Sequence, residues 1–218
     1  MQAPFLHVIQ QQQLWFCGLR YIFWEEAKAI ILSDVHIGKT GHFRKHGIAV
    51  PSNLLKEELQ RLLHIITFHK AKQLIVVGDL FHSYANNETD IFLQWRNQFP
   101  QFNFSLVKGN HDILPNSWYQ EANIQVHQSL YLAPFNFIHD LNDIDLTTNK
   151  QNYYFSGHIH PGIQLKGMGK QNLRFPCFYC TPQFTVLPAF SKFTGLANIK
   201  PKREDVVFAI VNDGIVKI

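Results

Sequence analysis

The chain has 218 residues, of which 46% are hydrophobic and 17% charged, so it can bury a sizeable core and is not expected to be disordered. Its formal net charge of +4 permits an anionic partner without requiring one. No stretch approaches the ~20 apolar residues of a membrane span, and the N-terminus lacks a signal-peptide pattern. We therefore expect a single cytoplasmic domain over residues 1–218, with no membrane association.

The first half of the chain alternates strand-like and helix-like segments. Continuous apolar runs that stop at a polar cluster indicate strands buried on both faces. Leucines spaced three and four residues apart after Pro51 predict a helix with one apolar stripe. The strands expected here are Phe5–Ile9, Leu14–Phe23, Ala29–Leu32, Gln73–Val77 and Phe104–Val107, with a glutamine-rich hairpin turn at 10–13 and helices at about 51–69 and 88–99.

The second half of the chain is mostly strand. Its apolar segments are rich in β-branched and aromatic residues, and Asn212-Asp213-Gly214 is typical of a hairpin turn. The strands expected here are Ile124–His127, Ser129–Ala133, Phe135–His139, Tyr153–Ser156 and Val206–Val211. Together the two halves predict an α/β protein in which two β-sheets pack together with helices outside.

The three cysteines do not describe a disulfide framework, because their number is odd and their spacing is irregular. Cys177 and Cys180 form a C-x-x-C pair, but a zinc knuckle would need a second pair, which the sequence lacks. We interpret both, and Cys17, as buried reduced thiols, since cysteine readily serves as a small hydrophobic residue.

Polar clusters follow several of the predicted strands. Asp34-Val35-His36 places a carboxylate and an imidazole two residues apart, and in extended backbone such side chains point the same way. Gly78-Asp79 and Gly109-Asn110-His111-Asp112 follow the next two strands, and Gly157-His158-Ile159-His160 spaces two imidazoles in the same way. Because open α/β sheets bind ligands at the carboxyl ends of their strands, we expect these clusters to form one site.

These side chains offer oxygen and nitrogen ligands and no thiolate. Such a set suits Mn²⁺, Fe or Zn²⁺ better than Mg²⁺, which accommodates fewer imidazoles. D-x-H and G-D alone are weak signals, because both occur by chance. G-N-H-D after a buried strand is much more specific, and H-x-H after Gly is moderately specific. Their ordered combination favours a metal site.

The ordered set D-x-H, G-D, G-N-H-D, a later His and G-H-x-H, which spans Asp34 to His160, resembles the calcineurin-like metallophosphoesterases. Further segments resemble one group within that family, the ligase-associated DNA damage response endonucleases. Those segments are Leu32–Pro51, Gly78–Ser83, Leu187–Phe190 and Phe193–Gly195.

The resemblance implies a four-layer sandwich with two mixed sheets and two divalent metal ions, Mn²⁺ foremost and Fe or Zn²⁺ as alternatives. It also implies an endonuclease that cleaves DNA in a repair context, in functional association with a DNA ligase and a helicase.

The same resemblance implies a role for each polar residue of the motifs. The implied metal ligands are Asp34, His36 and His160 for one ion, Asn110, His139 and His158 for the other, and Asp79 as the bridge between them. His111 would act on the scissile phosphate as a proton donor or charge stabiliser. His139 follows an apolar run as a strand-end ligand should, and His127 is the alternative for that position.

The sequence departs from the wider family at one position. Many members carry a second carboxylate three residues after the G-D aspartate, where this chain has His82. His82 either contacts the site or the substrate, or makes a hydrogen bond that supports one of the metal ligands.

A basic segment at 38–47 follows the first ligands and contains Lys39, Arg44 and Lys45. Lys and Arg beside a metal site can hold the flanking phosphates of a nucleic acid, although solvated loops of this composition are also common. The segment does not match a P-loop. We expect Lys39, Arg44, Lys45 and His82 to contact the substrate.

The expected chemistry is hydrolysis at phosphorus. Two ions ~3.5–4 Å apart can activate a water as hydroxide and offset the charge that develops on the phosphate. No Ser or Cys nucleophile with an adjacent base is evident, so direct attack is favoured over a covalent intermediate. Two alternatives stay open: an enzyme acting on small nucleotides, and a catalytically inactive scaffold, against which the complete ligand set and His111 argue.

Overall fold

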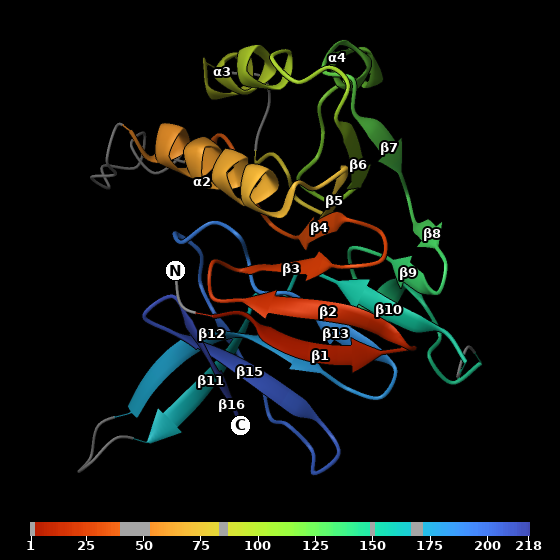
Figure 1. Cartoon of the computed structure of the whole chain (residues 1–218), viewed down its shortest axis with the longest axis vertical. Helices are drawn as coiled ribbons and strands as arrows, with labels where there is room; N and C mark the ends of the chain where they lie inside the picture. Colours follow the sequence, from red (N-terminus) through yellow and green to blue (C-terminus); the bar gives the residue numbers. More distant parts are fainter. Residues whose placement is uncertain (1–2, 40–52, 83–86, 149–150, 167–171) are drawn as a thin grey trace.

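The computed structural model describes residues 3–39, 53–82, 87–148, 151–166 and 172–218. Within these ranges, two mixed β-sheets pack face to face, and the described helices gather over one of them (Figure 1). The helices are α2 (Leu54–His69), α3 (Asn87–Arg96) and α4 (Asn116–Glu121), with a short 3-10 helix, η1, at Leu141–Asp143.

The first sheet has seven strands in chain order. Neighbouring strands from β1 to β4 run antiparallel, and those from β4 to β7 run parallel, so the carboxyl ends of β4 to β7 share one edge of the sheet. The strands are β1 (Phe5–Ile9), β2 (Gln12–Cys17), β3 (Tyr21–Trp24), β4 (Ala29–Leu32), β5 (Gln73–Val77), β6 (Asn103–Val107) and β7 (Gln125–His127).

The second sheet has nine strands, and β9, β10 and β13 are parallel at its centre. Its main path runs β14-β11-β12-β13-β10-β9-β8, and β15 and β16 continue from β12. The strands are β8 (Leu130–Leu132), β9 (Phe135–Phe137), β10 (Tyr153–Ser156), β11 (Pro161–Lys166), β12 (Asn172–Cys180), β13 (Phe184–Val186), β14 (Ala197–Asn198), β15 (Val206–Val211) and β16 (Gly214–Lys217).

The parallel strands of the first sheet carry apolar side chains on both faces. Leu32, Val76 and Leu106 pair in register and belong to the core under the helices. Ile31 and Ile75 pair one residue earlier and belong to the core between the two sheets. Continuous apolar runs are therefore required here, because each strand is covered on both sides.

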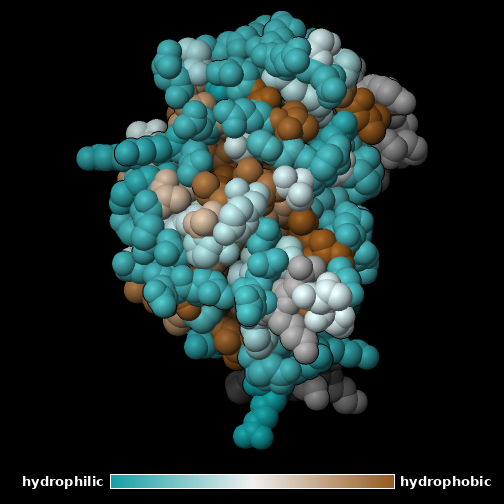
Figure 2. Space-filling view, turned by 90° about the vertical axis from the view of Figure 1, so that its right-hand side faces the viewer, coloured by the Kyte–Doolittle hydropathy of each residue, from teal (hydrophilic) through white to brown (hydrophobic). Residues whose placement is uncertain are grey.

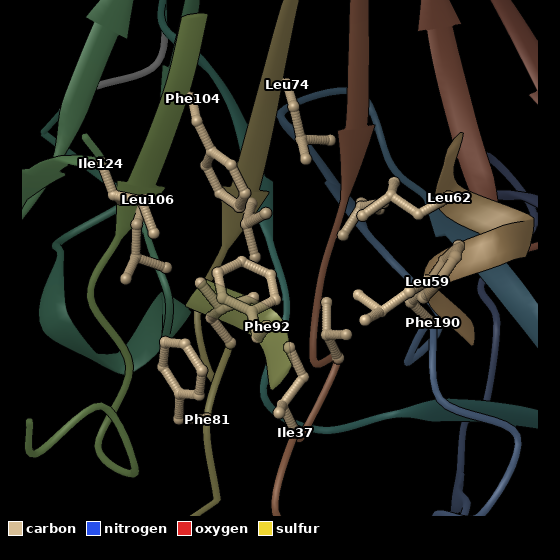
Figure 3. Packing of buried hydrophobic residues seen from close by; sticks show 14 of the residues in the cluster. Ile37, Leu59, Leu62, Leu74, Phe81, Phe92, Phe104, Leu106, Ile124 and Phe190 are labelled. Carbon is tan, nitrogen blue, oxygen red and sulfur yellow. The ribbon is translucent and has the colours of Figure 1, made fainter. Parts of the chain in front are cut away.

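The core under the helices is dominated by leucine and phenylalanine (Figure 3). Leu59 and Leu62 project from α2 toward the sheet, and Phe92 projects from α3. The rings of Phe81 and Phe92 meet edge to face, with centroids 5.3 Å apart. Since Phe81 lies two residues after Asp79, this packing also anchors one of the loops that carry candidate ligands.

The outer face of the second sheet carries a small apolar cluster that includes Ile163, Cys177 and Val207. Ile199, from the segment after β14, packs on this cluster, and no helix covers it in the described ranges. Within the described ranges, the α-helices predicted outside the sheets therefore cover the first sheet, and none covers the outer face of the second. No described helix is both long and apolar enough to cross a membrane.

The predicted α/β class with two packed mixed sheets is confirmed. The strand predicted at Leu14–Phe23 is wrong in extent, because the chain turns at 18–20, where Arg20 takes a left-handed conformation with φ of 68°. Helix α4 and the four strands β11 to β14 were not predicted from the sequence. The three cysteines are buried free thiols, as predicted.

We expect Phe92→Ala to lower the free energy of unfolding by about 3–5 kcal/mol, because it empties a fully buried ring site in the helix-covered core. Chemical denaturation monitored by circular dichroism measures the change. The neighbouring Ile91, which is 47% exposed, supplies the control: Ile91→Ala should shift stability by no more than about 1 kcal/mol. Equal losses in both variants would contradict this account of the core.

Candidate metal centre

The candidate ligands converge where strand ends of the two sheets meet. From the first sheet, Asp34 follows β4, Asp79 follows β5 and Asn110 follows β6. From the second sheet, His139 follows β9 and His158 follows β10. Parallel pairing aligns the strand ends within each sheet, and the packing of the sheets brings the two rows together.

One group of ligand atoms comes from Asp34, His36 and His160, which lie within 4.8 Å of one another. Nε2 of His36 and Nε2 of His160 are 3.2 Å apart, and Nε2 of His160 is 3.5 Å from Oδ1 of Asp34. Asp34 is fully buried. Two imidazole nitrogens thus face each other beside a buried carboxylate, as ligands of one cation would.

A second group is centred on Nε2 of His139. This atom lies 3.0 Å from Oδ1 of Asn110, 3.1 Å from Nδ1 of His158 and 3.7 Å from Oδ1 of Asp79. Ligand atoms of Asp34, Asp79 and His139 also lie within 4.8 Å of one another, so Asp34 takes part in both groups. Both carboxylates therefore lie near the junction between the groups, and the bridging role of Asp79 stays a prediction.

These separations fit ligand atoms that share an ion. Bonds of about 2.0–2.2 Å place neighbouring ligand atoms about 3 Å apart at right angles and about 3.5 Å apart in a tetrahedron. The gaps of 3.0–3.7 Å around His139 fall in this range. The donor set of imidazole nitrogen, carboxylate oxygen and amide oxygen also suits a divalent transition metal.

Two glycines allow the backbone to approach the ligands closely. A Cβ atom on Gly78 would lie 1.7 Å from Nδ1 of His139, and one on Gly109 would lie 2.2 Å from Oδ1 of Asp79. These contacts explain why both motifs carry glycine just before the polar residue. Gly78 also has a φ of 84°, which disfavours any larger residue.

The ligand loops are strained, and hydrogen bonds hold them. Positive φ angles, which residues other than glycine rarely adopt, occur at five of the candidate ligands: Asp34, His36, Asp79, His158 and His160. The backbone N–H groups of Asp34 and His36 donate to the carbonyls of Gly78 and Asp79 at 3.1 and 3.0 Å. The loops after β4 and β5 are thereby fastened to each other.

Asp112 ties the loop after β5 to the loop after β6. Its buried carboxylate accepts hydrogen bonds from the backbone N–H groups of Phe81 and Gly109, both at 2.9 Å. Burial raises the pKa of Asp112 to about 7. Asp112 belongs to the G-N-H-D motif, but its role could not be predicted from the sequence because its partner Phe81 is 31 residues away.

Residues 188–191 form a strap that supports the loop after β4, which carries Asp34. The backbone N–H of Phe190 donates to the carbonyl of Ser33 at 2.8 Å, and that of Ser191 donates to the carbonyl of Asp34 at 3.3 Å. These bonds continue the sheet-like pairing of Ser33 with Ala189. The strap therefore helps to fix the backbone from which the Asp34 carboxylate projects.

Two arginines hold the strap in place. Arg20 donates to the carbonyls of Ala189 and Ser191 at 3.1 and 2.7 Å. Arg61, on α2, donates to the carbonyl of Phe190 at 2.6 Å and stacks 3.8 Å above the centre of its ring. Sequence reasoning missed both arginines, since no local motif marks a partner more than a hundred residues away.

Burial and neighbouring groups shift the pKa values of three candidate ligands, His36, Asp34 and Asp79. Burial lowers the pKa of His36 to about 3, so its imidazole is neutral and keeps a lone pair for a metal at neutral pH. Burial acts to raise the pKa of Asp34, but the hydrogen bond and charge of His160 hold it below its ordinary value. Burial raises the pKa of Asp79, and the backbone N–H of His111 opposes this shift.

His111 and His82 stand beside the ligands. Their rings are 4.7 Å apart, and the His36 ring lies 5.4 Å from His82 and 5.9 Å from His111. The backbone N–H of His111 donates to Oδ1 of Asp79 at 2.9 Å, which leaves its imidazole available for other contacts. Both histidines predicted to contact substrate are thus brought next to the centre.

Lys39 also lies close to the centre, since its backbone N–H donates to the carbonyl of His36 at 3.2 Å. Burial lowers the pKa of its amine, and the charges of Asp34 and Asp79 oppose this shift. Arg44 and Lys45 lie outside the described residues. His127 is placed elsewhere, at the end of β7 and paired in register with Val107. The structure therefore brings His139, and not His127, into the ligand cluster.

A further carboxylate that sequence reasoning missed is Asp140. Its Oδ2 lies 3.6 Å from Nε2 of His158, whose Nδ1 faces the second ligand group. Carboxylates commonly accept the second ring N–H of a metal-bound histidine and fix its orientation. Its position directly after His139 is the signal that was available in the sequence.

Comparison with protein families matches residues 27–176 to the calcineurin-like phosphoesterases. Comparison with curated proteins gives no match. Among solved structures, the chain is similar to a nuclease, MPE, from Pseudomonas putida, with 28% identity over 95% of this chain and 96% of that one and a TM-score of 0.80. Yfce, a phosphoesterase from E. coli, is a weaker match, with 13% identity over 87% and 97% of the two chains and a TM-score of 0.45.

We expect Gly78→Ala to displace the His139 ring and to weaken metal binding by at least roughly tenfold. Substitutions of residues that orient a metal ligand typically have effects of this size. Metal titration by calorimetry measures the loss. Gly195→Ala is the matched control, because a Cβ there meets no atom within 4 Å. If the two variants bind metal equally well, His139 is not a ligand.

Proposed function

The chain belongs to the calcineurin-like phosphoesterase family, as its motifs indicated, and from this premise we propose that it is a metal-dependent nuclease that hydrolyses phosphodiester bonds in DNA. The observation that carries the proposal is the convergence of seven oxygen and nitrogen ligand residues in two adjoining groups at one sheet junction. The likeness to a nuclease at 28% identity over nearly the whole chain supports the choice of substrate.

The ligand residues fall into three sets. Those proposed for one ion are Asp34, His36 and His160, those for the other are Asn110, His139 and His158, and Asp79 serves both. When bound, two divalent ions supply positive charge against the phosphate oxygens and a water of lowered pKa. We propose Mn²⁺ as the native ion, with Fe and Zn²⁺ as the alternatives, because imidazoles make up four of the seven ligands.

The remaining side chains bind and orient the substrate. The His111 imidazole is proposed to donate a hydrogen bond or a proton to the phosphoryl group, since its ring lies beside His36 while its backbone is held by Asp79. The His82 ring lies against His111 and would hold it in place. The amine of Lys39 would contact a flanking phosphate, and Arg44 and Lys45 follow it in sequence.

The biological setting that fits this chemistry is DNA repair. The motifs shared with the ligase-associated endonuclease group support a functional association with a DNA ligase and a helicase. Pull-down with tagged ligase and helicase from the same cell measures this association.

A substrate panel tests the proposed function. Metal-stripped protein reloaded with Mn²⁺, Fe²⁺, Zn²⁺ or Mg²⁺ is offered DNA, RNA, cyclic nucleotides and dinucleoside polyphosphates. We expect DNA cleavage with Mn²⁺ to dominate and Asp79→Asn to abolish both turnover and metal loading. A preference for small nucleotides would replace the nuclease with a nucleotide phosphodiesterase, and inactivity toward every substrate would leave a scaffold.

We expect His111→Ala to retain both metals and the fold while kcat falls by roughly 10²-fold, the usual loss for an acid or charge stabiliser. Alanine keeps the backbone hydrogen bond to Asp79, so the ligand loop is preserved. Single-turnover cleavage and metal analysis check the two parts. His64→Ala, on the exposed face of α2, is the control. Turnover near that of the wild type would remove His111 from the mechanism, and loss of metal would make it a ligand.

A further inference from the structure

A polar pocket of about 330 Å³ lies between α4 and the ends of β6 and β7. Its lining combines one lysine, one histidine and three amides with the apolar side chains of Ile124 and Val126. The polar lining residues are Lys108, Asn116, Tyr119, Gln120, His127 and Gln128. A molecule in this pocket would meet one positive charge and several hydrogen-bond donors and acceptors.

The backbone ties this pocket to the candidate metal centre. Lys108 directly follows β6 and precedes the candidate ligand Asn110 by two residues, a span of at most ~7 Å. The backbone N–H of Lys108 donates to the carbonyl of His127 at 2.8 Å, so the pairing of β6 with β7 extends to the wall of the pocket. The pocket is therefore the next position along the sheet edge after the second group of ligands.

The sheet order places basic residues on both sides of the centre. Lys39 follows β4 and Lys108 follows β6, with the Asp79 loop of β5 between them. A polymer that crosses the centre along this edge would meet Lys39 on one side and Lys108 on the other. A small phosphodiester has a single phosphate, so it offers no second phosphate for the other lysine to bind.

His127 contributes an unsatisfied polar atom at this position. Its Nε2 is buried and has no hydrogen-bond partner within the described ranges. An unmet buried nitrogen lowers stability. The face that carries α4, β7 and β8 is otherwise mostly hydrophilic, with apolar side chains gathered at mid-height (Figure 2).

We propose that this pocket binds the nucleotide next to the cleaved bond, with its phosphate on Lys108 and its nucleoside among the amides. The inference rests on the proposed nuclease function and adds a second binding position to it. Phosphate contacts from lysine fix the register of a nucleic acid, and Asn and Gln side chains offer paired donors and acceptors to a base edge. A pocket of this volume accepts one nucleotide unit and excludes a base pair.

Lys108→Ala tests the proposal, with Lys72→Ala as the matched control. Lys72 precedes β5 and so lies at the opposite edge of the same sheet. Both variants remove one positive charge, and Lys108→Ala keeps the backbone bond to His127. In Mn²⁺, we expect Lys108→Ala to raise KM on a DNA oligonucleotide about tenfold, the usual effect of one lost charged contact. Bis(p-nitrophenyl) phosphate, which has no flanking phosphate and no base, should be hydrolysed as before.

The salt dependence of binding gives a second readout. Fluorescence anisotropy of a labelled oligonucleotide should show a slope of log Kd against log salt that is smaller by roughly 0.7–0.9 in Lys108→Ala than in Lys72→Ala, since one phosphate contact is lost. Equal KM values and equal slopes in the two variants would overturn the proposal that the pocket binds a nucleotide. An equal loss of activity on the oligonucleotide and on bis(p-nitrophenyl) phosphate in Lys108→Ala would also overturn it. If the wild type cleaves neither substrate, the nuclease proposal fails, while the anisotropy comparison still decides the pocket.

Discussion

The buried carboxylate of Asp34 is the constraint on which the rest of the centre depends. It has no exposed surface, and a negative charge in such a place is strongly destabilising unless positive or hydrogen-bonding partners surround it. The backbone N–H of His158 and the ring of His160 provide part of this compensation. A cation bound between them would provide more, and because only the folded chain presents these groups together, metal binding and folding are thermodynamically linked.

This constraint explains why so much of the fold serves a few loops. Residues with positive φ persist only where the surroundings determine their conformation fully, and three separate sets of contacts do so here. The strap at 188–191 holds Asp34, the Asp112 carboxylate fastens the loops after β5 and β6, and the packing of Phe81 on Phe92 anchors the loop after β5 from below. The strain is therefore distributed over both sheets and the helical layer, and it does not depend on any single contact.

The candidate ligands could be picked out from the sequence because most of them lie in polar clusters that follow a strand recognisable from its apolar run. The local rule that ligands lie at the carboxyl ends of parallel strands then brings them together without knowledge of tertiary contacts. What could not be predicted depends on distant partners: Arg20 and Arg61 act on a strap near the C-terminus, and nothing near them in sequence indicates it. The split of the Leu14–Phe23 segment was missed because Arg20 there adopts a left-handed conformation without a glycine.

The sheet order that assembles the ligands also sets the direction in which a long substrate can lie. Parallel strands place successive loops side by side, so Lys39, the Asp79 loop and Lys108 form a row in which each member belongs to the next strand. A nucleic acid backbone is likewise a row of charges at regular intervals, and such a row is bound best by positive groups repeated along one edge. A substrate with a single phosphate gains nothing from the outer members of the row. The arrangement of the strands, in addition to the ligands themselves, therefore supports the proposal of a polymeric phosphodiester as the substrate over a small nucleotide.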